Sequence, residues 1–223
     1  MTSPFLKEYK SYHGIYKIIV IGTSGTGKTS FVRRWTKNKF DDNYQVTLAA
    51  DREIRVISKG KSLYQIAIWD LPGMDHNPHL TKIFAKDAQG CIILADVTNE
   101  QSLQDTIKWK KELDMQVLFP DHQPIPSVLV ENKIDVLSEI EQRDMQNVAR
   151  FAKKNGFDAA FRVSVKEGKN VEQVMEWLID NIIDRMKSIK DLENSLVKNE
   201  HNKFLKQTKG SIYEKENKMT KCC

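Results

Sequence analysis

Short apolar runs and amphipathic stretches alternate along the first 186 or so residues of this chain. Residues 16–22, YKIIVIG, form a nearly continuous apolar run, which is typical of a strand that is buried on both faces. Asn99 is a suitable N-cap for a helix with Leu103, Ile107 and Leu113 on one face. The same pattern predicts further strands at residues 53–57, 63–69, 90–97, 127–130 and 159–163, and further helices at 28–37, at 138–155 and from 170 to beyond 186.

This alternation of strands and helices favours an α/β fold. A strand, a helix and a second strand in succession usually form a parallel pair, so we expect a three-layer arrangement with helices on both faces of a mostly parallel six-stranded sheet. Residues 59–61, Lys-Gly-Lys, form the one hairpin turn between two predicted strands. One edge strand should therefore be antiparallel.

The periodicity fades from about residue 190, where Lys, Asn, Gln and Glu dominate. Seven Lys stand against three Glu between Lys198 and Lys221. Such a segment is usually a solvated, disordered end, and a basic one can also be attracted to a membrane surface. We therefore expect a flexible N-terminal extension at residues 1–14, one domain at 15–189 and a basic, hypervariable tail at 190–223.

The composition is that of a soluble globular protein, with 40% hydrophobic and 29% charged residues. The net charge of +5 over 223 residues is too modest to indicate nucleic acid as a partner. Residues 1–13 contain no apolar segment of the kind found in secretory signals. Three Cys, two of them adjacent at positions 222 and 223, cannot form a disulfide framework. A reducing, cytosolic setting is expected.

Residues 22–29, GTSGTGKT, fit the phosphate-loop pattern G-x-x-x-x-G-K-[ST], and they stand between a predicted strand and a predicted helix. Glycines let the backbone N–H groups turn toward phosphate oxygens, and the helix N-terminus adds favourable partial charge. Lys28 would reach the β- and γ-phosphates, and the Thr29 hydroxyl would ligate Mg²⁺. The loop predicts nucleotide contacts from Ser24, Gly25, Thr26, Gly27, Lys28, Thr29 and Ser30.

Two later motifs indicate which base is bound. NKID, residues 132–135, directly follows a buried strand, and SVK, residues 164–166, follows the next one. A carboxylate at Asp135 can accept from both N1–H and the exocyclic amine of guanine, a donor pair that adenine lacks. The order of the motifs therefore favours GTP over ATP, and it disfavours a P-loop kinase or ATPase. The predicted base contacts are Asn132, Lys133, Asp135, Ser164, Val165 and Lys166.

Together these motifs resemble the signature elements of Ras-like small GTPases over about residues 15–186. Trp69 before Asp70, and the pair Cys222–Cys223, are similar to the Rab subfamily. WKKEL, residues 109–113, and SVKEGKNV, residues 164–171, are most similar to the Rab thirty-two / thirty-eight branch. The resemblance implies a P-loop NTPase fold that binds GTP or GDP with Mg²⁺.

The resemblance also implies roles for residues outside the phosphate loop. Thr47, 19 residues after Lys28, matches the switch I residue that binds Mg²⁺ and the γ-phosphate. Asp70 matches the acid that holds Mg²⁺ through water, and the Gly73 N–H matches the γ-phosphate sensor. Phe40 matches the aromatic residue that packs on guanine, although a plain loop anchor is the alternative. Both switches would be released after hydrolysis.

Three departures from the family pattern stand out. Switch I reads TLAADR, residues 47–52, in place of the usual Thr-Ile-Gly-x-Asp-Phe. The three positions that Rab effectors commonly contact hold Arg52, Trp69 and Phe84, and the charge at Arg52 should favour an acidic partner unless it only faces water. Met74 occupies the position of the catalytic Gln that orients the attacking water. A thioether cannot orient water, so intrinsic hydrolysis should be slow.

The remaining expectations concern the cellular setting that the resemblance implies. Cys222 and Cys223 resemble a double-Cys geranylgeranylation site, and two lipid chains with a basic spacer anchor a protein stably. The chain would then be a monomer that is cytoplasmic and peripheral on the cytosolic face of an endomembrane. Its partners would be effectors, an exchange factor, a GTPase-activating protein, a prenylation escort and a GDP-dissociation inhibitor. Two hypotheses remain open: a slow GTPase switch in vesicle traffic, or a GTP-locked pseudo-GTPase that serves as a membrane-attached scaffold.

Overall fold

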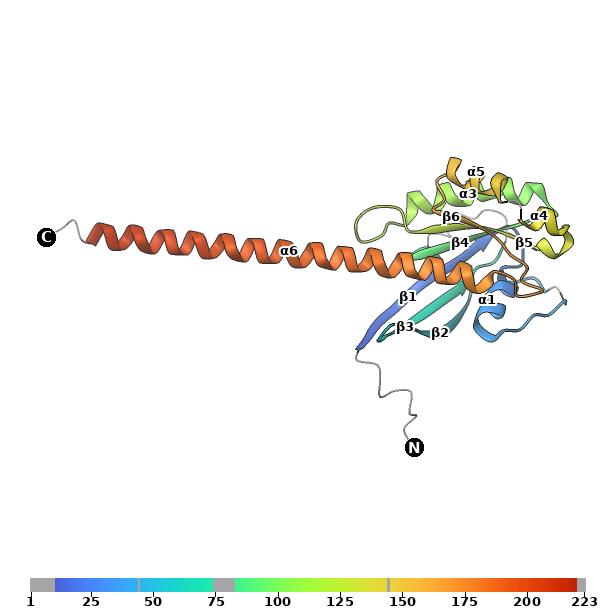
Figure 1. Cartoon of the computed structure of the whole chain (residues 1–223), viewed down its shortest axis with the longest axis horizontal. Helices are drawn as coiled ribbons and strands as arrows, with labels where there is room; N and C mark the ends of the chain where they lie inside the picture. The colour runs from blue at the N-terminus through green and yellow to red at the C-terminus, as the bar shows by residue number, and fades with distance from the viewer. Residues whose placement is uncertain (1–10, 44, 74–82, 144, 220–223) are drawn as a thin grey trace, which may run out of the picture. The chain divides into compact units, whose positions relative to one another are not determined.

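A six-stranded sheet forms the centre of the protein, in the order β2-β3-β1-β4-β5-β6. The computed structural model describes residues 11–43, 45–73, 83–143 and 145–219, and it is shown in Figure 1. Four strand pairs are parallel, and β2 pairs with β3 in antiparallel register at the sheet edge. The predicted fold class is therefore confirmed. The strands are β1 (Ser11–Gly22), β2 (Asp51–Lys59), β3 (Ser62–Asp70), β4 (Gly90–Asp96), β5 (Ser127–Asn132) and β6 (Ala159–Arg162).

Helices cover both faces of this sheet. Gly90 and Cys91 are neighbours on β4, so they face opposite sides. A side chain at Gly90 would meet Leu178 and Ile182 of α6, whereas Cys91 lies near Lys110 of α3. The buried residues of β4 and β5 fill the space between the two helical layers. The helices are α1 (Lys28–Lys37), α3 (Glu100–Gln116), the 3₁₀ turn η2 (Ile134–Val136), α4 (Glu139–Arg143), α5 (Gln146–Lys154) and α6 (Val171–Met219).

Helix α3 begins as predicted but faces the sheet with an unexpected set of residues. Asn99 is the N-cap, and its side chain accepts from the Ser102 N–H at 3.3 Å. Leu103 and Ile107 are only half-buried. The buried residues of α3 are Ser102, Thr106, Trp109, Lys110 and Leu113. Of the predicted apolar face, only Leu113 is buried.

The segment beyond residue 190 differs most from its prediction. The chain divides into two compact units, residues 1–182 and 183–223. Helix α6 continues to Met219 where a disordered tail was expected. The region from Val171 to Met219 has no proline and a single glycine, Gly210, while Lys, Glu, Gln and Leu are good helix formers. Among the described residues, no helix is both long and apolar enough to cross a membrane.

The first unit also differs slightly from its predicted start. Strand β1 begins at Ser11, so residues 11–14 of the expected N-terminal extension belong to the sheet. A bulge between Tyr12 and Ile15 interrupts the pairing with β3, and Gly14 adopts a φ of 106° there. Residues 1–10 of that extension lie outside the described residues, so their predicted flexibility stays a prediction.

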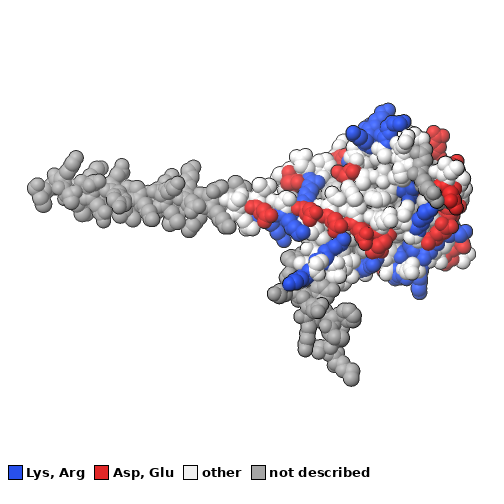
Figure 2. Space-filling model, viewed as in Figure 1, with Lys and Arg blue, Asp and Glu red and all other residues white. Residues whose placement is uncertain are grey.

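Ion pairs connect β2 to the helices beside it. Arg55 donates to Glu172 of α6 at 2.9 Å, Lys59 lies 2.9 Å from Asp180, and Lys37 of α1 pairs with Glu53. Figure 2 shows acidic and basic side chains interspersed on the face that it draws. Exposed pairs of this kind contribute little each, so burial of the apolar faces supplies most of the stability.

Candidate nucleotide-binding site

The phosphate loop joins the end of β1 to the start of α1. Its glycines Gly22, Gly25 and Gly27 adopt positive φ values of 136°, 80° and 95°, which only glycine adopts without strain. A side chain at Gly27 would also collide with the Asn132 amide. The first turn of α1 carries no acidic residue. Successive N–H groups at a positive helix end make this loop suited to an anion.

Lys28 lies beneath this loop and is only 5% exposed. Its Nζ donates to the Gly22 and Thr23 carbonyls at 2.9 and 3.0 Å. Burial lowers the pKa of Lys28 to about 8, and the charge of Asp70 opposes that shift. Neutral carbonyls do not balance the ammonium charge, so an anion in the loop would stabilise it.

Three oxygen-bearing side chains meet next to Lys28. The Thr29 hydroxyl donates to Asp70 Oδ2 at 2.5 Å and lies 2.7 Å from the Thr47 hydroxyl. Because the Thr29 proton points to Asp70, Thr47 must donate to Thr29. Asp70 Oδ1 is buried and has no hydrogen-bond partner among the described residues. Burial raises the pKa of Asp70, although the Thr29 hydrogen bond and Lys28 lower it. Such a set of hard oxygen donors around an unsatisfied carboxylate fits Mg²⁺.

Gly73 lies directly against the phosphate loop. A side chain there would stand 2.7 Å from the Ser24 backbone nitrogen and would collide with Lys28 Nζ. The chain reaches this point through Leu71, whose N–H donates to the Val20 carbonyl at 3.2 Å. Pro72 fixes φ near −65° immediately before Gly73. Met74 follows outside the described residues, so its predicted role stays a prediction.

The predicted base-binding residues meet at the ends of β5 and β6. Asn132 is 3% exposed, and it donates to the Thr26 carbonyl at 2.9 Å while accepting from the Val165 N–H at 3.1 Å. The Ser164 hydroxyl donates to Asp135 Oδ1 at 2.7 Å. These bonds join NKID, SVK and the phosphate loop into one network, and they hold the Asp135 carboxylate in place.

Lys133 and Asp96 form an ion pair at the same end of the sheet. Lys133 adopts a φ of 68°, and its Nζ lies 2.5 Å from Asp96 Oδ2. Burial alone would raise the pKa of Asp96. Hydrogen bonds from Lys133 and Thr98 outweigh that effect and lower the pKa. The pair joins the turn between Asn132 and Asp135 to the end of β4.

Phe40 and Lys166 each have one contact that bears on the base side of the site. Phe40 is half-buried, and the guanidinium carbon of Arg34 lies 5.8 Å from its ring centroid. Lys166 Nζ lies 3.9 Å from Asp42. The Lys166–Asp42 contact connects the segment after α1 to the SVK loop, whereas Phe40 contacts α1 itself through Arg34.

The predicted effector positions are only partly brought together. Arg52 pairs with Trp69 across the β2–β3 ladder, and its guanidinium carbon lies 5.9 Å from the Trp69 ring centroid. Lys17 Nζ lies 4.7 Å from the same ring. No contact of Phe84 with the other two is seen in the described part of the chain. Trp69 is therefore flanked by two cations.

Sequence reasoning missed three charged residues near the proposed base-binding residues: the pair Glu131 and Arg162, and Arg34. Glu131 and Arg162 form a mostly buried ion pair, with Arg162 Nε 2.8 Å from Glu131 Oε2. A charge inside the apolar run SVLVEN was the one available signal for such a pair. For Arg34, neither its position in α1 nor its neighbours in the sequence indicated a role near the base-binding residues.

The strand, phosphate loop and helix, with an oxygen cluster beside the buried lysine, have the architecture of a P-loop GTPase. The Ras family model matches residues 17–184 of this chain. Ras-related protein Rab-7L1 of Rattus norvegicus is 32% identical over 76% of this chain and 83% of that protein. Ras-related protein Rab-32 of Homo sapiens is 31% identical over 82% of each chain. Ras-related protein Rab-32A of Dictyostelium discoideum is 34% identical over 78% of this chain and 80% of its own length.

The chain therefore belongs to the Ras family, as a divergent Rab-like GTPase. The predicted family resemblance is confirmed. Members of this family bind guanine nucleotides, typically with Mg²⁺.

Proposed function

We propose that the chain is a GTP-dependent switch in membrane traffic that hydrolyses GTP slowly on its own. The observation that carries the proposal is the cluster of Thr29, Thr47 and Asp70 beside Lys28. A metal-bound triphosphate at this place would contact both the phosphate loop and switch I. The cluster can therefore report whether the γ-phosphate is present.

Each residue of the cluster has a distinct task in this proposal. Lys28 and the loop N–H groups hold the phosphates, and Gly73 offers its N–H where the γ-phosphate would end. Thr29, Thr47 and Asp70 would hold Mg²⁺, which supplies charge to offset that developing on the phosphate oxygens. When the γ-phosphate leaves, Thr47 and Gly73 lose a shared partner, and both switches are released.

Asp135, Ser164 and Asn132 would read the guanine base in the same proposal. Asp135 presents a carboxylate that Ser164 holds, and Asn132 fixes the neighbouring backbone. Lys133, Val165, Lys166 and Phe40 would line the remaining sides. The arrangement favours a base with two adjacent donors, which guanine has.

The chain lacks the Gln side chain that orients the attacking water in GTP hydrolysis. Met74 stands where a Gln would orient the attacking water, and sulfur is a weak acceptor without a proton to donate. Even with that Gln, intrinsic rates in this family are on the order of 10⁻⁴ s⁻¹. Slow hydrolysis would keep the switch in its GTP form until an activating protein supplies the missing amide.

Single-turnover GTP hydrolysis by the wild type, Met74→Gln and Met74→Leu tests this proposal. Met74→Gln should be faster by at least about tenfold, because a positioned group is restored. Met74→Leu should match the wild type, since neither side chain orients water. Equal rates for Met74→Gln and the wild type would show that position 74 does not limit hydrolysis.

A second arm separates the switch from the GTP-locked scaffold. A Rab-type activating protein that supplies both Arg and Gln should accelerate hydrolysis by the wild type. If an activating protein accelerates hydrolysis by Met74→Gln but leaves the hydrolysis rate of the wild type unchanged, the chain is a pseudo-GTPase. Its role would then be to hold effectors at a membrane.

We also propose a lipid anchor at Cys222 and Cys223, which lie outside the described residues. Replacing both Cys by Ser should move the protein from the membrane fraction of cells to the supernatant. Cys91→Ser is not a suitable control, because it would place a polar hydroxyl in the core. Cys222→Ser alone therefore serves as the single-site comparison. Membrane retention of the double variant would refute the anchor.

A further inference from the structure

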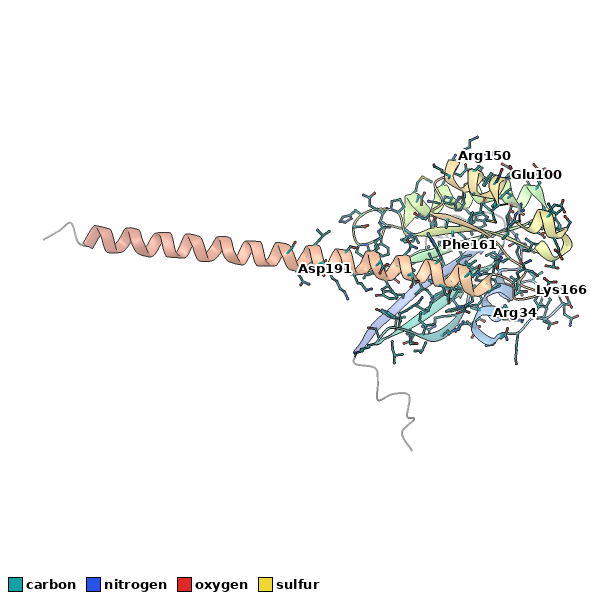
Figure 3. The ribbon with its side chains drawn as sticks, in the orientation of Figure 1. Arg34, Glu100, Arg150, Phe161, Lys166 and Asp191 are labelled. Atoms are coloured by element: carbon teal, nitrogen blue, oxygen red, sulfur yellow. The ribbon has the colours of Figure 1, made fainter. Side chains whose placement is uncertain are left out.

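Arg34 lies in the last turn of α1 and points to the loop that follows β6. Its Nε donates to the Val165 carbonyl at 2.9 Å, and its Nη2 donates to the Lys166 carbonyl at 2.7 Å. Figure 3 labels Arg34 and Lys166 at the same end of the molecule. The planar guanidinium thus holds two successive carbonyls of the SVK loop, with the directionality of a fork.

The remaining nitrogen of Arg34 reaches the opposite side. Nη1 lies 3.1 Å from Asn38 Oδ1 and 3.3 Å from the Asn38 carbonyl. Asn38 ends α1 with a left-handed φ of 50°. The guanidinium carbon also lies 5.8 Å from the ring centroid of Phe40. One side chain therefore connects the SVK loop to the segment that follows α1.

The SVK loop is held from two sides at one residue. Asn132 Oδ1 accepts from the Val165 N–H at 3.1 Å, whereas Arg34 donates to the Val165 carbonyl. The stem of Arg34 continues along the loop, because a side chain at Gly168 would stand 3.6 Å from Arg34 Cδ. Losing Arg34 would leave only the Asn132 side of this restraint.

A simpler role for Arg34 is to stabilise the C-terminal end of α1. A cation in the last turn interacts favourably with the helix dipole, and the bonds to Asn38 belong to that role. The bonds to Val165 and Lys166 do not, because they leave the helix for carbonyls more than 130 residues away in the chain. The two roles predict different effects on base recognition.

We propose that Arg34 is a positioning residue for guanine recognition, acting through the SVK loop and Phe40. The proposal rests on the base pocket described under the proposed function. When the loop is held, Ser164 keeps Asp135 oriented toward both donors of guanine. Without Arg34 the Asp135 carboxylate loses its fixed direction. The affinity for guanine then falls more than the affinity for a base that has one donor fewer.

Dissociation of fluorescent GDP and IDP from the Mg²⁺-bound protein measures this effect. IDP carries hypoxanthine, which lacks the exocyclic amine of guanine. We expect GDP to dissociate from Arg34→Ala at least about tenfold faster than from the wild type. This change corresponds to the loss of one to two charge-assisted hydrogen bonds. IDP should be affected much less, so the ratio of the two rates should approach one.

Two further variants keep the test interpretable. Arg34→Lys retains the charge but not the fork, so it should resemble Arg34→Ala in its GDP to IDP ratio. Lys37→Ala removes a cation from the same last turn of α1, where Lys37 pairs with Glu53, and its ratio should equal that of the wild type. Thermal unfolding of each variant reports any general loss of stability separately.

The outcomes separate this proposal from the one on which it rests. A wild type that binds GDP and IDP equally would refute the guanine pocket itself. A wild type that prefers GDP, together with an unchanged GDP to IDP ratio in Arg34→Ala and Arg34→Lys, would refute the positioning role. Faster release of both nucleotides in proportion would assign Arg34 to helix stability alone.

Discussion

Two parts of the site differ in how many of their polar groups are hydrogen-bonded within the chain. The base side comprises the residues proposed to bind guanine, and the phosphate side comprises those proposed to bind the phosphates and Mg²⁺. On the base side, both amide atoms of Asn132 are bonded, Ser164 donates to Asp135, and Lys133 pairs with Asp96. On the phosphate side, Asp70 Oδ1 has no hydrogen-bond partner among the described residues, and Lys28 has its pKa lowered to about 8. The fold organises the base side by itself, whereas the phosphate side gains most from a ligand.

This difference assigns different tasks to the two sides. A network whose members are already paired is rigid, and rigidity suits the discrimination of one base from another. Buried charges without full compensation respond strongly when an oppositely charged partner arrives or leaves. The base side would therefore set specificity, and the phosphate side would supply affinity and switching.

Lys28→Ala should have the largest effect, because it removes the buried ammonium from the phosphate side. We expect GDP affinity to fall about a thousandfold or more, as for the loss of one partner of a buried charge pair. Calorimetry with GDP measures this loss, and Lys37→Ala provides a matched exposed lysine on α1. If GDP affinity falls less than tenfold, the phosphate side does not dominate binding.

Asp135→Asn should have the next largest effect, and it acts on the base side. The neutral amide cannot accept from both guanine donors, so GDP affinity should fall about a hundredfold. Xanthine carries a carbonyl in place of the exocyclic amine, so XDP should bind this variant better than it binds the wild type. An Asp135→Asn protein that still prefers GDP to XDP would place base recognition elsewhere.

Asp96→Asn should have the smallest effect, because it removes one ion pair and keeps an acceptor for Thr98. The pKa of Asp96 is lowered in the folded protein, so the pair stabilises the fold above the usual carboxyl pKa of 3.8. That contribution disappears as the pH falls through the lowered folded pKa. At pH 7 we expect about 1 kcal/mol of lost stability, a shift of roughly 2–4 °C in Tm.

Thermal unfolding of Asp96→Asn and the wild type from pH 7 to pH 3 measures this difference. The two curves should approach each other as the pH falls below the usual carboxyl pKa of 3.8, because the contribution of the ion pair is lost toward the lowered pKa of Asp96. GDP affinity at pH 7 should stay within about threefold of the wild type. A constant gap in Tm at every pH would mean that packing, and not the ion pair, accounts for the loss.

Features with local signals could be predicted from the sequence. The phosphate loop between a strand and α1, the N-cap at Asn99 and the turn at residues 59–61 each depend on neighbouring residues alone. Asn132, Asp135 and Ser164 were also predicted to meet, because they follow successive strands of one sheet. In the structure they do so.

Features that depend on tertiary neighbours could not be predicted in the same way. Lys110 is buried on α3 because Asp114 neutralises it one turn later, so hydrophobicity alone chose the wrong face. The partners of Arg34 lie in a loop that only the folded sheet brings near. For α6, polar composition suggested a disordered tail, whereas helix propensity favoured the helix that the structure has.

The close approach of Gly27 to Asn132 has a consequence for which ligands fit. Asn132 donates to the Thr26 carbonyl, and no side chain fits between Gly27 and the Asn132 amide. The separation between the base pocket and the phosphate loop is thereby fixed by direct contact. On the proposed function the site would therefore select its ligand by length as well as by chemistry, and a guanosine analogue with a longer linkage between sugar and phosphate should fail to reach both ends.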